Sequence, residues 1–410
     1  MKEFIAFIEV KNKYEYVAKA KKRGFNVVVF EKDVDDKIIN LADVVIKCDT
    51  RDYNETIMRI LEFSAKNKII GVIPLHEQSV ELTAIAAKIL GVYGLNIKAA
   101  VLCRNKFLTR LFLKKAGIVI PNFSLCSDLN NLENTIVNTK INLPVIIKPL
   151  NFSGSSGVIK INDFGEITQK IKVALEERSR SSCKDSMVDT MEKYWLVEEY
   201  IDGFEVSVQT VSINGKTKII AIHDKVIKMD EDFSERFVLT PSWRINAELQ
   251  NKINDYCLKV LEALQFDFGI SHLELRIRDE EPILIEANAR LGGGMTNEIV
   301  KASTQIDLFS LLLNMCIGKQ QQIDIKQRKY IAVERIHAAK GVITQIKGLD
   351  NTVLHNEVLQ LKQWKQVGDV IRTPSRDVIG AVMVEGITAK DALDKLDKYR
   401  ENICVQTENK

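Results

Sequence analysis

Residues 269–294 read GISHLELRIRDEEPILIEANARLGGG, and the rest of the chain is organised around them. His272, Glu274 and Arg276 alternate with apolar residues, and a repeat of two is the pattern of a β-strand. A second strand begins at Pro282. The stretch therefore predicts an antiparallel hairpin with one polar face.

The polar face of this hairpin brings two carboxylates together. With the turn centred near Glu280, Glu274 faces Glu286 and His272 faces Asn288, and opposed Cβ atoms in such a pair lie roughly 5 Å apart. Carboxylates this close repel, and one would lose its charge unless a divalent cation lay between them. The sequence predicts Mg²⁺ here; two glutamates on the wet face of an ordinary hairpin are the structural alternative.

The residues that follow the second strand favour an anion site. Asn288 and Arg290 continue the face of Glu286, so an amide and a cation follow the carboxylates. A helix is expected from Met295, and the first N–H groups of a helix attract anions. Glycines without side chains precede it: Gly292, Gly293 and Gly294. Carboxylates for a metal beside groups for anions are typical of phosphoryl transfer.

Length and composition bound the class of protein. The 410 residues are enough for about three domains, and 46% hydrophobic with 28% charged residues is typical of a soluble globular enzyme. A net charge of +3 provides no broad field for nucleic acid or a membrane surface. No stretch approaches the roughly 20 apolar residues of a membrane span or forms a signal peptide. Seven cysteines are scattered without a CxxC pair, so we expect reduced thiols in a cytoplasmic protein.

The first 95 or so residues predict an open, mainly parallel sheet with helices. Strands are expected at 4–10, 26–30, 43–47 and 69–73, with one helix ending at Arg23, one beginning near Asp52 and a last helix at 77–90. The turn after the first strand reads EVKNKYEY. Because it holds no glycine to let pyrophosphate approach the backbone, we reject a nicotinamide site there.

A second candidate phosphate site lies in the middle of the chain. Lys148 closes the buried strand PVIIKP and directly precedes the loop NFSGSSGVI. Gly154 and Gly157 permit tight turns, while Ser155 and Ser156 add donors, which together suit a phosphate lid. An ordinary turn is the alternative. By itself Lys106, in an expected helix, has no assigned role.

Three later segments complete the pattern. Residues 178–193 are polar and serine-rich and are interpreted as a surface insertion. A further strand places His223 and Lys225 on one face, but a lone histidine is more often structural, and we favour that reading for His223 and His272. From Tyr330 onward strands dominate and a helix closes the chain, which we interpret as a structural cap or a surface for homodimerisation.

The ordered set Lys106, Lys148, GSSG, EEYI, Glu205, Glu274 and ENAR resembles the ATP-grasp enzymes over nearly the whole chain. GISHLELR, EANARLGGG and HDK followed by Pro241 look most like carboxylate–amine ligases of the L-amino-acid ligase type. The resemblance implies an α/β and α+β fold with a biotin-carboxylase-like layout. Its parts would be a Rossmann-like domain at 1–95, a two-part ATP clamp at 96–318 and a strand-rich C-terminal domain at 319–410.

The resemblance also implies roles for individual residues. Lys106 and Lys148 would contact ATP phosphates, Lys225 would be a further phosphate contact, and Arg290 would steady the reacting acyl group. The remaining implied sets are a lid of Ser153, Gly154, Ser155, Ser156, Gly157 and Val158; adenine contacts at Glu198, Glu199 and Ile201; a ribose contact at Glu205; metal ligands Glu274, Glu286 and Asn288; and substrate contacts at Arg290, Gly292, Gly293 and Gly294.

The implied reaction converts a carboxylate into an acyl phosphate with ATP and Mg²⁺, or Mn²⁺ in its place, so that an amine can attack it. The partners are then small carboxylates and amines, with amino acids expected for both. Many relatives carry an acid after the glycine pair, where this chain has Gly294 and Met295, so substrate preference does not transfer. The alternatives are a carboxylase or purine-pathway ligase using bicarbonate or formate, and a nucleotide-binding regulator without turnover.

Overall fold

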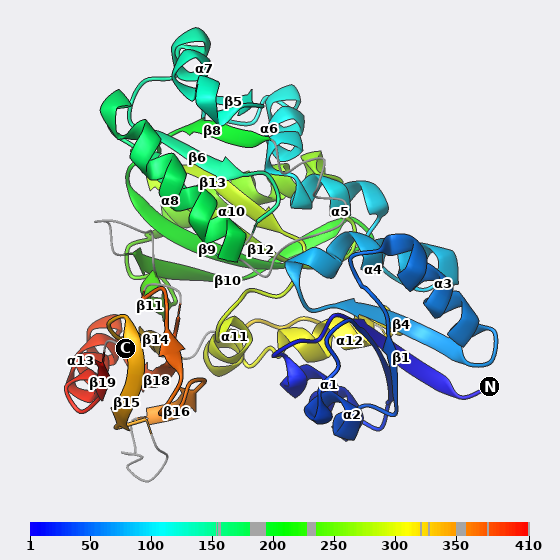
Figure 1. Cartoon of the computed structure of the whole chain (residues 1–410). Helices are drawn as coiled ribbons and strands as arrows, with labels where there is room; N and C mark the ends of the chain where they lie inside the picture. Colours follow the sequence, from blue (N-terminus) through cyan, green and yellow to red (C-terminus); the bar gives the residue numbers. More distant parts are fainter. Residues whose placement is uncertain are drawn as a thin grey trace.

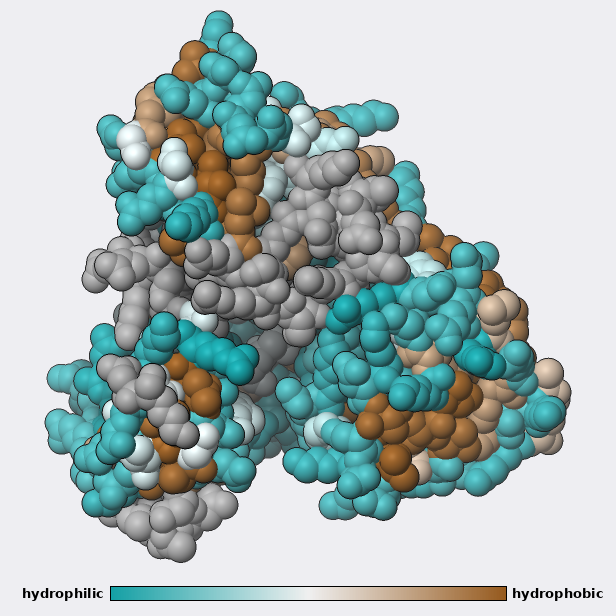
Figure 2. All heavy atoms as spheres, in the orientation of Figure 1, coloured by the Kyte–Doolittle hydropathy of each residue, from teal (hydrophilic) through white to brown (hydrophobic). Residues whose placement is uncertain are grey.

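The protein is described from a computed structural model that covers residues 1–152, 154, 157–180, 194–227, 235–319, 322–326, 329–349, 358–374 and 377–408. N-terminal, middle and C-terminal parts meet around one central region (Figure 1). In the space-filling view a recess separates the N-terminal from the C-terminal part (Figure 2). Within the described ranges, none of the helices is both long and apolar enough to span a bilayer.

The N-terminal part is the expected parallel α/β sheet. Its four strands run in the order β3-β2-β1-β4, and every pairing is parallel. The strands are β1 (Glu3–Ile8), β2 (Asn26–Glu31), β3 (Val44–Lys47) and β4 (Lys68–Pro74). The helices are α1 (Tyr14–Lys22), α2 (Asp36–Leu41), α3 (Tyr53–Ser64) and α4 (Val80–Leu90), with the 3-10 helix η1 (Glu77–Ser79) before α4. Helix α2 was not predicted.

Both faces of this sheet are buried. On one face Phe4, Phe30 and Ile60 form a core with α3 and α4. On the other, Phe7 stacks against Phe309 of α12 (Leu308–Cys316), whose leucines also pack against residues of the central sheet. The N-terminal part therefore shares one hydrophobic core with the middle of the chain.

The middle part contains two sheets. A four-stranded antiparallel sheet has the order β5-β8-β6-β7 and carries two helices. Its elements are β5 (Phe123–Cys126), η2 (Leu129–Asn131), α7 (Leu132–Thr139), β6 (Val145–Pro149), β7 (Ile159–Ile161), η3 (Phe164–Glu166), α8 (Ile167–Arg180) and β8 (Trp195–Glu199). The predicted insertion at 178–193 begins in the last turn of α8, and its residues 181–193 lie outside the described part.

The second sheet is antiparallel and has eight strands in the order β13-β12-β9-β10-β11-β14-β18-β16. One face packs on α5, α6 and α10. The strands are β9 (Phe204–Ile213), β10 (Lys216–Ile227), β11 (Glu235–Thr240), β12 (Gly269–Arg278), β13 (Glu281–Asn288), β14 (Tyr330–Ile336), β16 (Val358–Gln363) and β18 (Gly380–Gly386). The helices are α5 (Ile97–Arg104), α6 (Lys106–Lys115), α10 (Ala247–Ala263) and α11 (Thr296–Thr304).

The C-terminal part is strand-rich, as expected, but only some of its strands form a sheet of their own. β11 pairs with β14 along Phe237–Thr240, so three C-terminal strands extend the sheet that contains the central hairpin. The remaining elements are β15 (Gly341–Lys347), β17 (Val370–Ile371) and β19 (Cys404–Glu408), which form a small sheet, and α13 (Ala389–Arg400). The elements not predicted from the sequence, besides α2, are α7, α10, β5, β7, β11, β16, β17 and β19.

Candidate active site

The central hairpin has the predicted pairing. Glu274 lies opposite Glu286 and His272 opposite Asn288. The turn, however, is the tighter Asp279–Glu280 pair, both with positive φ, which is the type I′ geometry that suits two-residue hairpins. A β-bulge between Glu274 and Leu275 then adds the residue that restores the predicted register.

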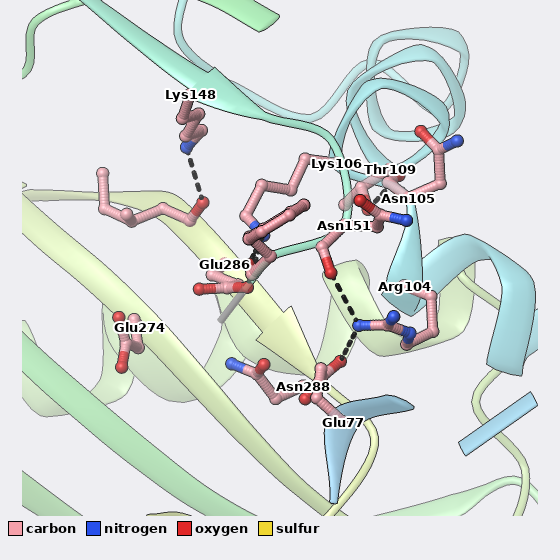
Figure 3. Close-up of polar contacts among 12 residues, drawn as sticks. Glu77, Arg104, Asn105, Lys106, Thr109, Lys148, Asn151, Glu274, Glu286 and Asn288 are labelled. Carbon is pink, nitrogen blue, oxygen red and sulfur yellow. Dashed lines mark hydrogen bonds and ion pairs between the residues drawn. The ribbon is translucent and has the colours of Figure 1, made fainter. Parts of the chain in front are cut away.

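The bulge leaves Ile285 outside the ladder of paired residues, and its carbonyl group is used for a different purpose. Its oxygen accepts from Arg110 Nη2 at 2.9 Å and from Lys148 Nζ at 3.4 Å. The carbonyl thereby anchors two cations from α6 and β6 over the hairpin. Figure 3 shows Lys148 above the hairpin.

The two opposed carboxylates are each paired with a lysine. Lys106 Nζ lies 2.8 Å from Glu286 Oε1 (Figure 3) and donates to the Phe152 carbonyl at 2.7 Å. Lys225 Nζ lies 3.1 Å from Glu274 Oε1. Burial would raise the pKa of Glu274, but Lys225 lowers it well below 4.5. The prediction that repulsion requires a metal was therefore wrong in its reason, because lysines distant in sequence offset the charge.

The oxygen donors nevertheless suit Mg²⁺. Glu274 and Glu286 oppose each other, and Asn288 adds an amide that bonds Arg290 Nη2 and the His272 carbonyl. Mg²⁺ is usually held by one or two carboxylates, with water and phosphate oxygens completing its octahedron. In the described part of the chain no three His, Cys, Asp or Glu side chains cluster as a metal site, so phosphate oxygens would have to supply part of the coordination.

His272 and His223 both line the cavity, although a structural role was favoured for each. His272 Nε2 lies 3.1 Å from Glu274 Oε1, and its Nδ1 lies 2.6 Å from Gln209 Nε2. With the amide donating to Nδ1, the network assigns the ring proton to Nε2, which donates to the carboxylate. His223 bonds Thr240 through Nδ1. Sequence periodicity places these residues on a polar face but does not reveal that the face is buried.

Glu198 is the centre of the adenine end predicted from the sequence. Its carboxylate is 3% exposed and bonds Arg110 and, at 2.5 Å, Lys148. Burial would raise the pKa of Glu198, but Arg110 and then Lys148 lower it; burial lowers the pKa of Lys148. Glu199 instead pairs with Arg278 at 2.7 Å. The Glu198 side chain therefore positions Lys148, while the chain from Glu198 to Ile201 lines the cavity.

Glu205, the predicted ribose contact, lies beside two cations. Lys225 Nζ is 2.6 Å from Glu205 Oε1 and Arg276 Nε is 3.5 Å from Oε2. Burial would lower the pKa of Lys225, but Glu205 and Glu274 raise it. Lys225 therefore stays charged, and it contacts both the predicted ribose contact, Glu205, and the predicted metal ligand, Glu274.

Arg290 is held by a carboxylate from the N-terminal part. Its Nε lies 2.6 Å from Glu77 Oε2, and the side chain of Glu77 is 3% exposed. Arg104 lies 3.6 Å from the same carboxylate and donates to the Asn151 carbonyl at 3.0 Å (Figure 3). The charge of Arg290 also affects Lys13 in the N-terminal part: burial first, and then Arg290, lowers the pKa of Lys13 to about 8. No motif marks Glu77 in the sequence, because this contact joins segments more than two hundred residues apart.

One cavity of about 410 Å³ joins these groups. The predicted site residues that line it are Lys106, Lys148, Gly154, Val158, Glu198, Glu199, Ile201, Glu205, Lys225, Glu274, Glu286, Asn288, Arg290, Gly293 and Gly294. Gly157 instead packs on Pro149, and a Cβ at Gly292 would lie 2.7 Å from the Thr296 side chain. Ser153, Ser155 and Ser156 lie outside the described residues. The cavity also contains Val333, Arg335, Trp364, Val378 and Ala381, so the C-terminal part is more than a structural cap.

Comparisons with known proteins agree with this geometry. Residues 141–298 match the ATP-grasp domain, and residues 336–408 match the L-amino acid ligase C-terminal domain 2. Residues 141–298 are therefore similar to an ATP-grasp domain, and enzymes that carry this domain generally use ATP and Mg²⁺. The second match shows that the C-terminal residues are similar to a domain of the L-amino acid ligases.

The individual curated relatives share only about a quarter of their aligned residues with this chain. A D-alanine–D-alanine ligase of Coprothermobacter proteolyticus is 28% identical over 214 residues, covering 50% of this chain and 64% of that protein. An alanine–anticapsin ligase of Bacillus subtilis is 27% identical over 257 residues, covering 58% of this chain and 52% of that protein. The chain thus spans about half to two thirds of these curated relatives.

Solved structures show the same fold over the whole chain. The L-amino acid ligase from Bacillus licheniformis has a TM-score of 0.84 at 23% identity, covering 100% of this chain and 99% of that one. A phosphoribosylglycinamide synthetase from Anaerococcus prevotii has a TM-score of 0.73 at 19% identity, covering 99% and 100%. The predicted ATP-grasp fold is confirmed.

Proposed function

We propose that the protein is an ATP-dependent carboxylate–amine ligase that joins amino acids through an acyl phosphate and releases ADP and phosphate. The observation that carries the proposal is the row Glu274–Glu286–Asn288 lying between Lys106 and Arg290 in one cavity. The matched L-amino acid ligase C-terminal domain favours an amine as the second substrate over bicarbonate or formate.

The residues divide the chemistry between them. Lys106 and Lys148 would offset the charge on the transferred phosphoryl group, and Arg290 would hold the substrate carboxylate and the oxyanion that forms on it. Glu274, Glu286 and Asn288 would hold Mg²⁺, which neutralises the charge of the phosphates when bound. Carbonyl activation by phosphorylation needs no protein nucleophile.

The direct test is phosphate release from ATP with amino acids supplied singly and in pairs, followed by chromatography of the nucleotide. We expect ADP, phosphate and a nitrogen-containing product that appears only when both substrates are present. AMP with pyrophosphate, or product without nitrogen from the amine, would exclude this reaction. Phosphate release with bicarbonate or formate alone would favour the alternative reactions of the same fold.

The location and assembly also remain proposals. The described cysteines are free thiols, five of them buried, and free thiols persist in the reducing cytoplasm, where we propose that the enzyme works. That the protein forms a homodimer stays a prediction from the sequence. The other partners proposed for the protein are its small-molecule substrates. The roles of the lid residues 153–158 likewise stay predictions.

A further inference from the structure

The cavity has a second half whose chemistry differs from that of the metal row. Along one cross-strand row, Lys225 pairs with Val238, Val238 with Val333, and Val333 with Met383. The floor of the cavity therefore changes from charged to apolar as the sheet passes from β10 to β18. Met295 and Ile299, before and in α11, pack against these residues.

One cation lies in this apolar half. Arg335 is two residues beyond Val333 on the same face of β14, and its Nη2 lies 3.0 Å from Glu235 Oε1. A Cβ on Gly294, whose φ is +61°, would lie 2.7 Å from Arg335 Nη2, so glycine leaves room for the guanidinium before α11. A guanidinium carries five N–H donors, and a single carboxylate uses at most two. Arg335 can therefore bind a second carboxylate.

A ligase that joins two amino acids must distinguish two carboxylates, because only one is to be phosphorylated. Arg290 lies beside the metal row, whereas Arg335 lies beside the apolar residues. Gly294, which lies beside Arg335, is four residues after Arg290, and that segment spans at most about 14 Å. The two cations are therefore near enough for one to hold the carboxyl group being activated and for the other to hold the carboxylate of the amine substrate.

We propose that Arg335 and the apolar residues Val238, Met295, Ile299, Val333 and Ala381 bind the amine substrate, an α-amino acid with an apolar side chain. Arg335 holds its carboxylate away from phosphoryl transfer, and Glu235 keeps the guanidinium directed into the cavity. This inference rests on the proposed ligase function and adds the class of the second substrate.

Arg335→Gln tests the carboxylate contact. We expect the KM of the amine substrate to rise by at least about tenfold, as for loss of a charge-assisted hydrogen bond, with the KM of ATP unchanged. The matched control is Arg400→Gln, because Arg400 pairs with Glu334, the neighbour of Arg335 that points to the other face of β14. An unchanged KM in Arg335→Gln would mean that the ion pair with Glu235 is only structural and would overturn the proposal.

Hydroxylamine separates this proposal from the ligase function itself. It traps an acyl phosphate as a hydroxamate and has no carboxylate for Arg335 to bind. We expect the ratio of hydroxamate to dipeptide to rise at least about tenfold in Arg335→Gln. Equal losses of both products would assign Arg335 to the activated substrate and overturn the proposal. A wild-type protein that forms no hydroxamate would instead contradict the proposed function.

The wild-type enzyme provides a test that does not depend on a folded variant. For amines from glycine through alanine to leucine, kcat/KM should rise by roughly fourfold per buried methylene group. The amide of a given amino acid should react at least about tenfold less well than the free acid, because it cannot pair with Arg335. A preference for charged side chains, or equal rates with amide and acid, would overturn the proposal.

Discussion

Glu286 is the residue on which the metal assignment depends most directly. Glu286→Gln keeps the shape of the side chain and can still accept from Lys106, but it removes a charged ligand. We expect kcat to fall about 100-fold or more and the Mg²⁺ requirement to rise, because the ion would be held less tightly at the phosphates. The measurement is turnover across a Mg²⁺ titration, with cooperative melting retained.

The matched control for that experiment is Glu281→Gln. Glu281 belongs to the same strand but is exposed at the hairpin turn, where it pairs with Lys252 at 3.0 Å. It should leave turnover and the Mg²⁺ titration as they are in the wild type. If Glu286→Gln behaved like Glu281→Gln, the metal ligands would have to be sought elsewhere in the cavity.

His223 predicts how stability depends on pH. Burial, then His272 and Lys225, lowers the pKa of His223 from 6.5 to about 3. The unfolded chain therefore binds a proton between these values that the folded chain does not, and stability is lost as pH falls below 6.5. At pH 5 the loss from this group is about 2 kcal/mol. Urea unfolding of wild type and His223→Asn at pH 7.5 and pH 5 should show a smaller loss in the variant; equal losses would contradict the prediction.

Single residues show where sequence reasoning stops. Alternation along one strand was enough to place Glu274 opposite Glu286, because pairing in a hairpin follows from its turn. The partners Lys106 and Lys225 come from other elements. Their positions depend on tertiary packing, for which a local repeat carries no signal.

Among the elements, the 3-10 helix η1 of the N-terminal part supplies a contact to the candidate active site. Its Glu77 contacts Arg290 at 2.6 Å, and burial, which would raise the pKa of Glu77, is outweighed by Arg290 and Arg104, which lower it. The carboxylate is therefore charged and fixes the direction of Arg290. Glu77 is a positioning residue, because it contacts Arg290 and acts through that side chain.

Glu77→Gln should lower kcat about tenfold to 100-fold while the KM of ATP stays unchanged, because a misdirected Arg290 affects the transition state more than nucleotide binding. Glu81→Gln is the control: this carboxylate lies one turn further along, in α4, and bonds Tyr53 Oη at 3.0 Å. Kinetics with both variants check the prediction. A raised KM for ATP with an unchanged kcat would refute the positioning role.

Elements were predicted where their pattern was local and strong. The parallel strands of the first 95 residues and their helices other than α2 were found because each is a short apolar run or an amphipathic repeat between turn signals. Helix α10 carried a usable signal, since Leu249, Ile253, Cys257 and Val260 recur at helical spacing and are buried. β11 carried less, because it is short and one of its two neighbours in the sheet, β14, is distant in sequence.

At the scale of the molecule, the boundary proposed at residue 319 divides the chain but not the sheet. The eight-stranded sheet takes five strands from before that boundary and three from after it, joined by the β11–β14 pairing. The proposed boundary at residue 95 is likewise bridged, by the core that α12 forms with the N-terminal strands. Composition marked the connecting segments, whereas long-range pairing decides which parts fold together.

The continuous sheet predicts that the regions around β11 and β16 unfold together. Trp243 stacks on Phe237 of β11, and Trp364 follows β16 at the other end of the C-terminal strands. Trp195, in β8 of the other sheet, is the third tryptophan of the chain. Replacing two tryptophans at a time with phenylalanine leaves one fluorescent probe in each protein. Because the β11–β14 pairing joins both regions, the urea transitions reported by Trp243 and Trp364 should coincide.

The Trp195 probe shows whether the four-stranded sheet follows the same transition. If Trp364 reported an earlier, separate transition while Trp243 stayed native, residues 319–410 would be an independent domain, and the sheet pairing would contribute little to cooperativity.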